Sequence, residues 1–321
     1  MDHLRWLGQP ALHRPTVIAA FTGWNDGADA ASNAMRHLIE AWGATPLAEI
    51  DPEEFTDFAT VRPHVRLADG VTRSIVWPTV GAWSASTPGG DVILVLGPEP
   101  ALRWRLFSQQ VINLAQRFQS GLVITLGALL ADVPHTRPVQ LIGTATDGHL
   151  ISRFDLQRSH YEGPTGIVGV LHDACSTAGL DSASLWAAVP AYASQIPSPK
   201  ASLALVTRAC GILGSPTPVG RLAQEAFEYE QRVNALVHDD DDLVGYVARL
   251  ETLSTDDDDD DDDDDDEEDD LVGGELTDLD DDESGDLGGA DGGLAPIDPA
   301  ALDSDEFMAE VEQFLRDQPE P

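Results

Sequence analysis

The chain has 321 residues and a formal net charge of −39. Residues 1–238 hold 16 Lys and Arg against 21 Asp and Glu, whereas residues 239–321 hold 2 against 36. The first segment is therefore long and neutral enough to bury a hydrophobic core. The second segment cannot form such a core, because its charges repel one another and its apolar residues are few. With no basic patch interleaved with aromatic residues, we expect no nucleic-acid binding.

Three further features predict where the protein resides. The uncharged apolar run Gly121–Ala131 is far shorter than the roughly 20 residues of a membrane span, and Met1–Pro10 lacks the apolar stretch of a signal peptide. Cys175 and Cys210 have no metal-binding or C-x-x-C spacing, which is typical of buried, reduced thiols. The sequence thus predicts a cytoplasmic protein with no membrane segment and no metal site.

The first third of the chain predicts a strand, a helix and a strand. Thr16–Phe21 is a continuous apolar run, as in a buried strand. Ala28–Trp42 has apolar residues at helical spacing and ends before Gly43, and Thr45–Ile50 is the next strand. We therefore expect a β-α-β unit, with its strands paired in parallel, to open an α/β fold.

The next part adds a hairpin and continues the alternation. Asp69-Gly70 between Val61–Leu67 and Ser74–Trp77 is a strong hairpin signal, and it predicts a mixed rather than purely parallel sheet. Later strands are expected at Asp91–Leu96, Gly121–Leu126, Val139–Ala145, Gly166–Val170 and Leu185–Val189. Helices are expected at Leu102–Phe118, near His149–Asp155, up to Thr177, and at Ala201–Gly211 and Val219–Leu236.

The sequence predicts that the compact domain, residues 1–238, is followed by a disordered acidic linker at residues 239–302. This range contains a short helical piece, Leu243–Leu253, and a run of fifteen acidic residues, Asp256–Asp270. Residues 303–317 form an amphipathic pattern that predicts a short helix. Its apolar stripe is expected to bind a partner through Phe307, Val311 and Phe314.

The segment that joins the first strand to the first helix is the most distinctive. Gly23 and Gly27 permit a tight turn, and Asn25, Asp26 and Asp29 can accept hydrogen bonds from a helix N-terminus. Two interpretations remain open, a turn capped by its own side chains or a loop that binds an anion. Since the spacing matches neither common nucleotide motif, we expect no cofactor.

Four blocks of sequence resemble one known family. They are Phe21-Thr-Gly-Trp-Asn-Asp26, Thr125–Pro138, Tyr161-Glu-Gly-Pro-Thr-Gly166, and Ser184–Tyr192 with Ser198-Pro-Lys-Ala201. Together they resemble the proteasome assembly chaperone 2 (PAC2) family in its actinobacterial form. The resemblance implies a three-layer α/β/α fold of the nucleoside-phosphorylase or hydrolase type, self-association, and non-catalytic binding of proteasome subunits. Its motif residues here are Gly23, Trp24, Asn25, Asp26, Asp132, His135, Arg137 and Lys200.

The residues themselves leave an enzyme open as the alternative. Asp26, Glu99, Asp132, His135 and Asp147 all follow expected strands, and a carboxylate beside a histidine can serve as an acid–base pair. Such a site, built from the strand-end loops around Asp26 and His135, would suit a hydrolase or phosphorylase acting on a small molecule. No serine elbow, zinc motif or phosphate-binding lysine loop accompanies them, so we assign no catalytic residue.

The C-terminus departs from a motif seen in several proteasome-binding proteins. Those proteins end in a hydrophobic residue, a tyrosine and any residue, whereas this chain ends Asp317-Gln-Pro-Glu-Pro321. One hypothesis is that residues 303–317 bind instead and that the acidic run attracts a basic partner. A second is that the acidic residues only keep the protein soluble, and a third is that they mimic a nucleic acid.

Overall fold

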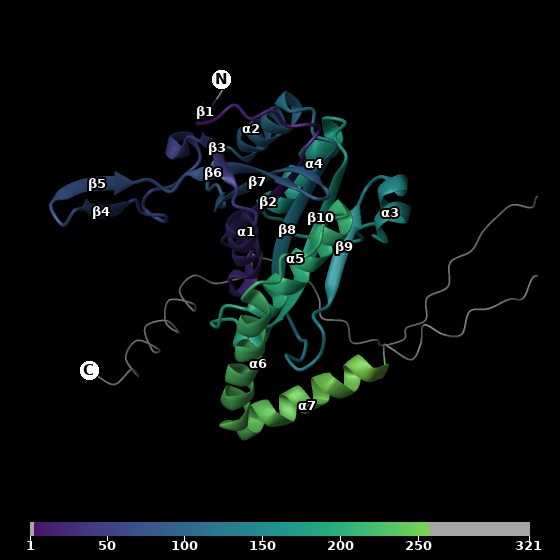
Figure 1. Ribbon diagram of the computed structural model, residues 1–321. Helices are drawn as coiled ribbons and strands as arrows, with labels where there is room; N and C mark the ends of the chain where they lie inside the picture. Colours follow the sequence, from purple (N-terminus) through teal and green to yellow (C-terminus); the bar gives the residue numbers. More distant parts are fainter. Residues whose placement is uncertain (1–2, 257–321) are drawn as a thin grey trace, which may run out of the picture. The chain divides into compact units, whose positions relative to one another are not determined.

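The computed structural model describes residues 3–256, and its centre is an eight-stranded sheet (Figure 1). Across the sheet the strand order is β1-β3-β6-β7-β2-β8-β10-β9. The strands are β1 Leu4–Trp6, β2 Thr16–Thr22, β3 Thr45–Ile50, β6 Val80–Thr87, β7 Gly90–Pro98, β8 Leu122–Ala131, β9 Leu141–Ala145 and β10 Ser182–Pro190.

The middle of this sheet is parallel and its flanks are antiparallel. β7, β2, β8 and β10 run in one direction, with Ile18 of β2 beside both Leu94 and Ile124. β6 and β9 pair antiparallel with β7 and β10, and β3 and β1 continue the antiparallel flank. The predicted mixed sheet is confirmed, and the carboxyl ends of the four parallel strands meet at one edge.

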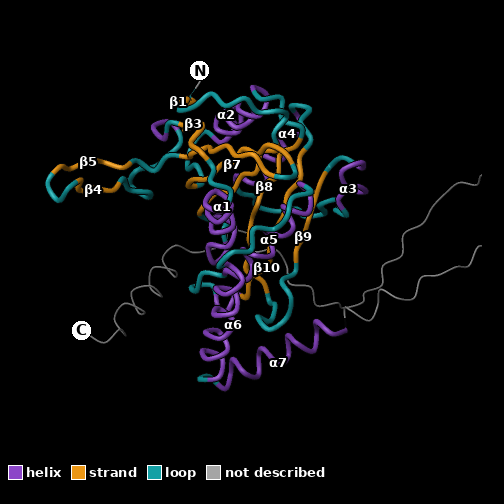
Figure 2. Tube along the Cα trace, viewed as in Figure 1, coloured by secondary structure: helices purple, strands orange, loops and turns teal. Residues whose placement is uncertain are grey.

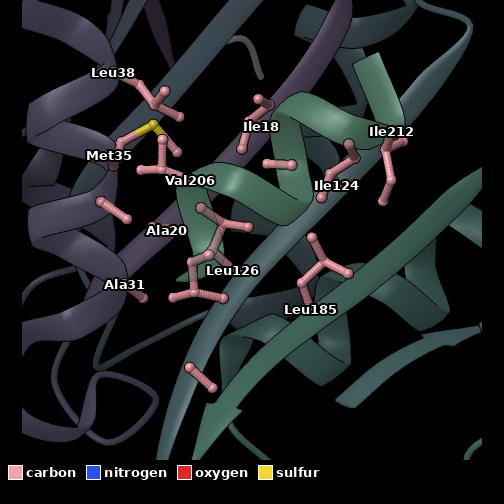
Figure 3. Packing of buried hydrophobic residues seen from close by; sticks show 14 of the residues in the cluster. Ile18, Ala20, Ala31, Met35, Leu38, Ile124, Leu126, Leu185, Val206 and Ile212 are labelled. Carbon is pink, nitrogen blue, oxygen red and sulfur yellow. The ribbon is translucent and has the colours of Figure 1, made fainter. Parts of the chain in front are cut away.

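Helices cover both faces of the sheet and complete the three layers. α1 (Ala30–Ala41) and α5 (Pro199–Leu213) pack on one face, where Met35 and Val206 meet Ile18, Ile124 and other strand residues (Figure 3). α2 (Trp104–Arg117) and α4 (Ile167–Thr177) pack on the other face. The α/β/α architecture that the resemblance implied is confirmed.

The remaining elements lie at the margins of these layers. The short helices are η1 (Gly27–Asp29), η2 (Pro52–Glu54), α3 (Gly148–Phe154) and η3 (Ala191–Ala193). After α5 the chain forms α6 (Leu222–His238) and α7 (Asp241–Asp256), which pack against each other through Val233, Val237 and Val247. Thus α7 lies inside the range 239–302 that the sequence assigns to a linker. The rest of that range and residues 303–317 lie outside the described residues.

The predicted hairpin exists, but it does not belong to the sheet. β4 (His64–Ala68) and β5 (Thr72–Val76) form a separate two-stranded ribbon that extends from the sheet as an arm (Figure 2). The antiparallel flank instead begins with β6, a strand that the sequence analysis missed because its residues are mostly small. The prediction of a hairpin is therefore confirmed. The inference that this hairpin makes the sheet mixed is wrong, because its strands are not part of the sheet.

Two other expectations are wrong. Gly166–Val170 is not a strand, because Ile167, Val168 and Leu171 belong to the buried face of α4. Helices accept such β-branched residues when tertiary packing buries them. The β2-α1-β3 unit does not make a parallel pair either, since β7 and β6 lie between its two strands.

Candidate functional site

The carboxyl end of β2 leads into a turn that we call the corner, residues 23–29. Gly23 has a φ of +122°, which an L side chain rarely adopts, and its carbonyl accepts from the Asp26 amide at 3.0 Å. Asn25 is fully buried and Asp26 is 6 % exposed, whereas Trp24 between them and Gly23 is 65 % exposed. The corner thus fixes its polar side chains inside and displays its tryptophan outside.

Asp26 caps the first helix. Its Oδ1 accepts from the backbone amides of Ala31 at 2.8 Å and Ser32 at 3.0 Å, which are free donors at the start of α1. Asp29 occupies the formal cap position but makes no capping bond through its side chain. Of the two interpretations of this turn, the structure shows the self-capped one.

Burial changes the acidity of the same carboxyl group. Desolvation is the main influence and raises the pKa of Asp26, although the hydrogen bonds from Ser32 and Ala31 act against it. Its second oxygen, Oδ2, has no hydrogen-bond partner in the described part of the chain. Asp26 is therefore a buried acid whose charged form is only partly compensated.

Glu99, at the end of β7, joins the corner to the opposite layer. Its Oε1 accepts from Asn25 Nδ2 at 2.7 Å and from the Ile167 amide at 2.8 Å, so it caps α4. The Asn25 carbonyl in turn accepts from Ala128 of β8 at 2.8 Å. Gly166 is required here, because a Cβ on it would lie 2.2 Å from Asn25 Oδ1. Three strands and two helices are tied together at this point.

The corner stores backbone strain. Ala28 and Asp29 have φ values of +48° and +54°, in the left-handed region where residues other than glycine are uncommon. Each such residue costs about 1–2 kcal/mol and persists only where its surroundings enforce it. Here two hydrogen bonds hold the strained backbone in place. The Ser198 amide donates to the Ala28 carbonyl at 2.9 Å, and the Ser202 hydroxyl donates to the Ala30 carbonyl at 2.8 Å.

His135 lies in the loop after β8 and is held from both sides. It is 3 % exposed, and its backbone amide donates to Tyr192 Oη at 2.8 Å. Tyr192 Oη can then donate to His135 Nδ1, 2.7 Å away, which leaves the ring proton on Nε2 to bind Asn234 Oδ1 at 2.9 Å. Every polar atom of the ring is thus engaged within the fold.

Lys200 at the start of α5 and Asp132 after β8 also have partners within the fold. Lys200 Nζ donates to the carbonyls of His135 at 2.6 Å and Arg137 at 2.7 Å, and it pairs with Glu230. Asp132 accepts from Tyr246 of α7 at 2.7 Å. The loop is therefore fixed to α5, α6 and α7, and its residues act here as positioning groups.

The structure brings together some of the predicted site residues and separates others. Asn25 and Glu99 meet, whereas Asp26 binds α1 and Asp147 caps α3 through the amide of His149 at 2.8 Å. The small cavity beside His135 has none of Gly23–Asp26 in its wall. The proposed acid–base pair of Asp26 and His135 is thus not assembled.

Sequence reasoning missed several partners, namely Tyr192, Asn234, Glu230 and Tyr246. Tyr192 and Gly166 do end two of the quoted sequence blocks, so those blocks held a signal that was not used. Asn234 and Tyr246 lie on helices, and the spacing of the polar residues on those helices does not indicate that either one contacts the loop.

Two features are absent from the described residues. In residues 3–256 no group of three or more His, Cys, Asp or Glu is placed to hold a metal ion. Within the same range, no helix has both the length and the apolar character to cross a membrane.

Comparison with known proteins connects this geometry to a family. A model described as the PAC2 family matches residues 20–237, which contain the corner, the His135 loop and Lys200. No curated protein matches the chain.

Solved structures resemble the chain over most of its length. A PAC2 family protein from Streptomyces avermitilis is 42 % identical, with a TM-score of 0.68, covering 73 % of this chain and 99 % of its own. A proteasome-assembly chaperone homologue from Mycobacterium tuberculosis is also 42 % identical, with a TM-score of 0.66 and coverage of 72 % and 99 %. A Corynebacterium glutamicum protein of unknown function, 23 % identical, shares the fold with a TM-score of 0.72 and coverage of 80 % and 98 %. The chain belongs to the PAC2 family.

Proposed function

We propose that this protein binds proteasome subunits during their assembly and does so without catalysis. The observation that carries this proposal is the 42 % identity to a proteasome-assembly chaperone homologue, which extends over 99 % of that relative. An assembly chaperone needs a fixed surface that shields apolar parts of a subunit until the subunits pair. Stable protein interfaces of this kind bury about 1,200–2,000 Å² in total.

The corner offers the centre of such a surface. Trp24, Leu130 and Tyr161 are 65 %, 50 % and 67 % exposed, and we call them the corner surface. They come from segments that meet there, because Leu130 lies beside Gly27, and Gly166, five residues after Tyr161, contacts Asn25. An exposed tryptophan on a rigid loop loses little entropy on binding and is a frequent energetic anchor.

The contacts of the polar residues favour binding over chemistry. In the enzyme alternative, a small-molecule hydrolase or phosphorylase, Asp26 and His135 would act on a ligand. Instead Asp26 caps α1, Glu99 caps α4, and Lys200 and His135 are engaged by the loop and its neighbours. Carboxylates thus fill the two helix N-termini at which an α/β fold would otherwise hold an anion.

The experiment is a binding titration with purified proteasome subunits from the same organism. We expect Trp24→Ala to weaken binding about 30-fold, as the loss of an interface anchor worth about 2 kcal/mol implies. Phe227→Ala is the matched control, because Phe227 is an aromatic residue 61 % exposed elsewhere, on α6. Absence of binding by the unaltered protein overturns the function, and equal losses in both variants overturn the assignment of the surface.

We also propose a cytoplasmic location. Its support is the state of the two cysteines, which are free and buried, so that burial raises the pKa of Cys175 to about 12 and that of Cys210 to about 11. Unpaired thiols suit a reducing compartment. Fractionation of the native host, with detection of the untagged protein, tests this location.

A further inference from the structure

A cleft of about 520 Å³ lies between β1, the edge strand of the sheet, and α2, and it shares no residue with the corner surface. Figure 1 shows these two elements side by side. On the side of β1 the cleft is lined by Leu4 and Trp6, which are alternate residues of the strand. On the side of α2 it is lined by three amide side chains, those of Gln109, Asn113 and Gln116. An apolar wall therefore faces a wall rich in hydrogen-bonding groups.

We call Gln109, Asn113 and Gln116 the amide row. Because they are four and three residues apart, they share one face of α2 and follow one another at about 6 and 4.5 Å along its axis. An extended peptide repeats every two residues, or about 6.6 Å, so its polar groups recur at a similar spacing. Each amide side chain offers both a donor and an acceptor, as a peptide unit does. Gln109 donates to Asn113 Oδ1 at 2.9 Å, an arrangement that directs the Asn113 amide donors and the Gln109 carbonyl to other partners.

A fourth amide of the same helix already binds extended main chain. Gln110 also lines the cleft and is only 1 % exposed. Its Oε1 accepts from the backbone amide of His3, the residue before β1, at 2.9 Å. Its Nε2 donates to the Leu106 carbonyl at 3.1 Å, which fixes the orientation of the amide group. One extended segment is thus held along α2 by a glutamine, and the amide row offers the same chemistry to a second segment.

Charge specifies the occupant further. The helix contains Arg105 and Arg117 and no acidic residue, although acids outnumber basic residues in the domain as a whole. Arg117 lines the cleft and stacks on Trp6, with its Cζ 4.1 Å from the ring centroid, and among residues 3–256 it forms no salt bridge. The stacking fixes the guanidinium plane, whose N–H groups can bind a carboxylate, and it covers a ring face on which a sugar would stack.

We propose that this cleft binds an extended segment of another polypeptide. The amide row binds the main chain of that segment, the apolar wall covers its side chains, and Arg117 pairs with an acidic side chain. Since the main chain supplies most of the contacts, the cleft accepts many sequences that contain an acidic residue.

The test is the fluorescence anisotropy of a labelled peptide, made of alternating threonine and valine with one central glutamate, titrated with the full-length protein. Gln109→Met with Gln116→Met should raise the dissociation constant about 10-fold, as the loss of two hydrogen bonds implies. Both glutamines are exposed, so neither change disturbs the core. Gln231→Met is the matched control, because Gln231 is an exposed glutamine of α6 outside the cleft. No binding by the unaltered protein, or a double variant that binds as tightly as the control, overturns the proposal.

Changes to the peptide test the recognition of its main chain without altering the protein. Two further peptides carry methyl groups on every second backbone nitrogen, in opposite phase, so that each loses the donors of one edge. One of them should bind about 10-fold more weakly than the other. Replacing the glutamate with glutamine should weaken binding at low salt, and added salt should reduce the difference.

Equal affinities of the two methylated peptides would contradict main-chain recognition and overturn the proposal. Binding of cellohexaose in place of the peptide would assign the cleft to a carbohydrate and also overturn it. No proteasome subunit takes part in these titrations, and Trp24→Ala should leave peptide binding unchanged. Their outcome is therefore independent of the proposed function.

Discussion

Asp26 gives the clearest prediction for a single residue. Its pKa is raised in the folded protein, mainly by burial, so the folded state holds the proton more tightly than the unfolded state does. Its contribution to stability is therefore full below the unfolded pKa of about 3.9 and is lost as the pH rises through the folded value. Asp26→Asn imitates the protonated acid and should remove this dependence.

The measurement is the free energy of unfolding by urea for both proteins over a range of pH. The advantage of the unaltered protein over Asp26→Asn should shrink as the pH rises. Asp91→Asn is a control of opposite sign, because hydrogen bonds from the Ser86 side chain and the His13 amide lower the pKa of Asp91. Its carboxylate stabilises the fold above the unfolded pKa and loses this effect as the pH falls. Parallel curves for the unaltered protein and Asp26→Asn would contradict the first expectation.

The corner also shows what the residues alone could predict. Glycines, an asparagine and acids between a strand and a helix identified a capped turn, because capping chemistry is local. The sequence could not choose among Asn25, Asp26 and Asp29, since the choice depends on Glu99 and Ser198, which lie far along the chain. The same dependence on distant residues explains why the sequence suggests Asp26 as the partner of His135, whereas the structure shows Tyr192.

At the scale of elements, hydrophobic periodicity predicts a helix correctly where one face of that helix is buried. α1, α2 and α5 were predicted within a few residues because each has an apolar stripe facing the sheet. The start of α4 failed, as a short β-branched run has no period of its own. The strand order also could not be read, because β6 and β7 are inserted between β2 and β3 by pairing that no local signal specifies.

α7 provides a prediction at this scale. Val247 is 6 % exposed and packs in the cluster of α6, whereas Val244 on the same helix is 43 % exposed. Val247→Ala should destabilise the docking of α7 by about 2 kcal/mol, through lost packing and the space that remains. Val244→Ala, with identical chemistry, should have a small effect.

Native-state hydrogen exchange measures this docking directly. We expect the amides of α7 to exchange about 30-fold faster in Val247→Ala, while the amides of β2 and β8 keep their rates. The contacts of Tyr246 with Asp132 and of Thr136 with Glu251 would weaken in the same event. If the two valine variants gave the same exchange in α7, the helix would not depend on this packing.

For the whole molecule, the uneven charge leads to a prediction about client binding. Residues 257–321 hold 30 acidic residues against one arginine, whereas residues 1–256 hold 27 acidic against 17 basic residues. A segment with this charge density raises the rate of association with a basic surface, and this effect weakens as added salt screens the charges. Deleting residues 257–321 should therefore slow association with proteasome subunits at low salt and reduce the salt dependence of the rate. The deletion keeps α7, which packs on the fold.

A variant with residues 257–270 replaced by serine separates charge from length. It should lose most of the rate enhancement although the chain remains equally long, while a role in solubility alone predicts unchanged rates and a more easily precipitated protein. The predicted binding stripe at Phe307, Val311 and Phe314 is tested in the same series by Phe307→Ser with Phe314→Ser. Slower association belongs to the acidic run, whereas faster dissociation belongs to the stripe, because apolar contacts act after encounter. If none of these changes alters the association or dissociation rate, the corner surface binds the client without help from residues 257–321.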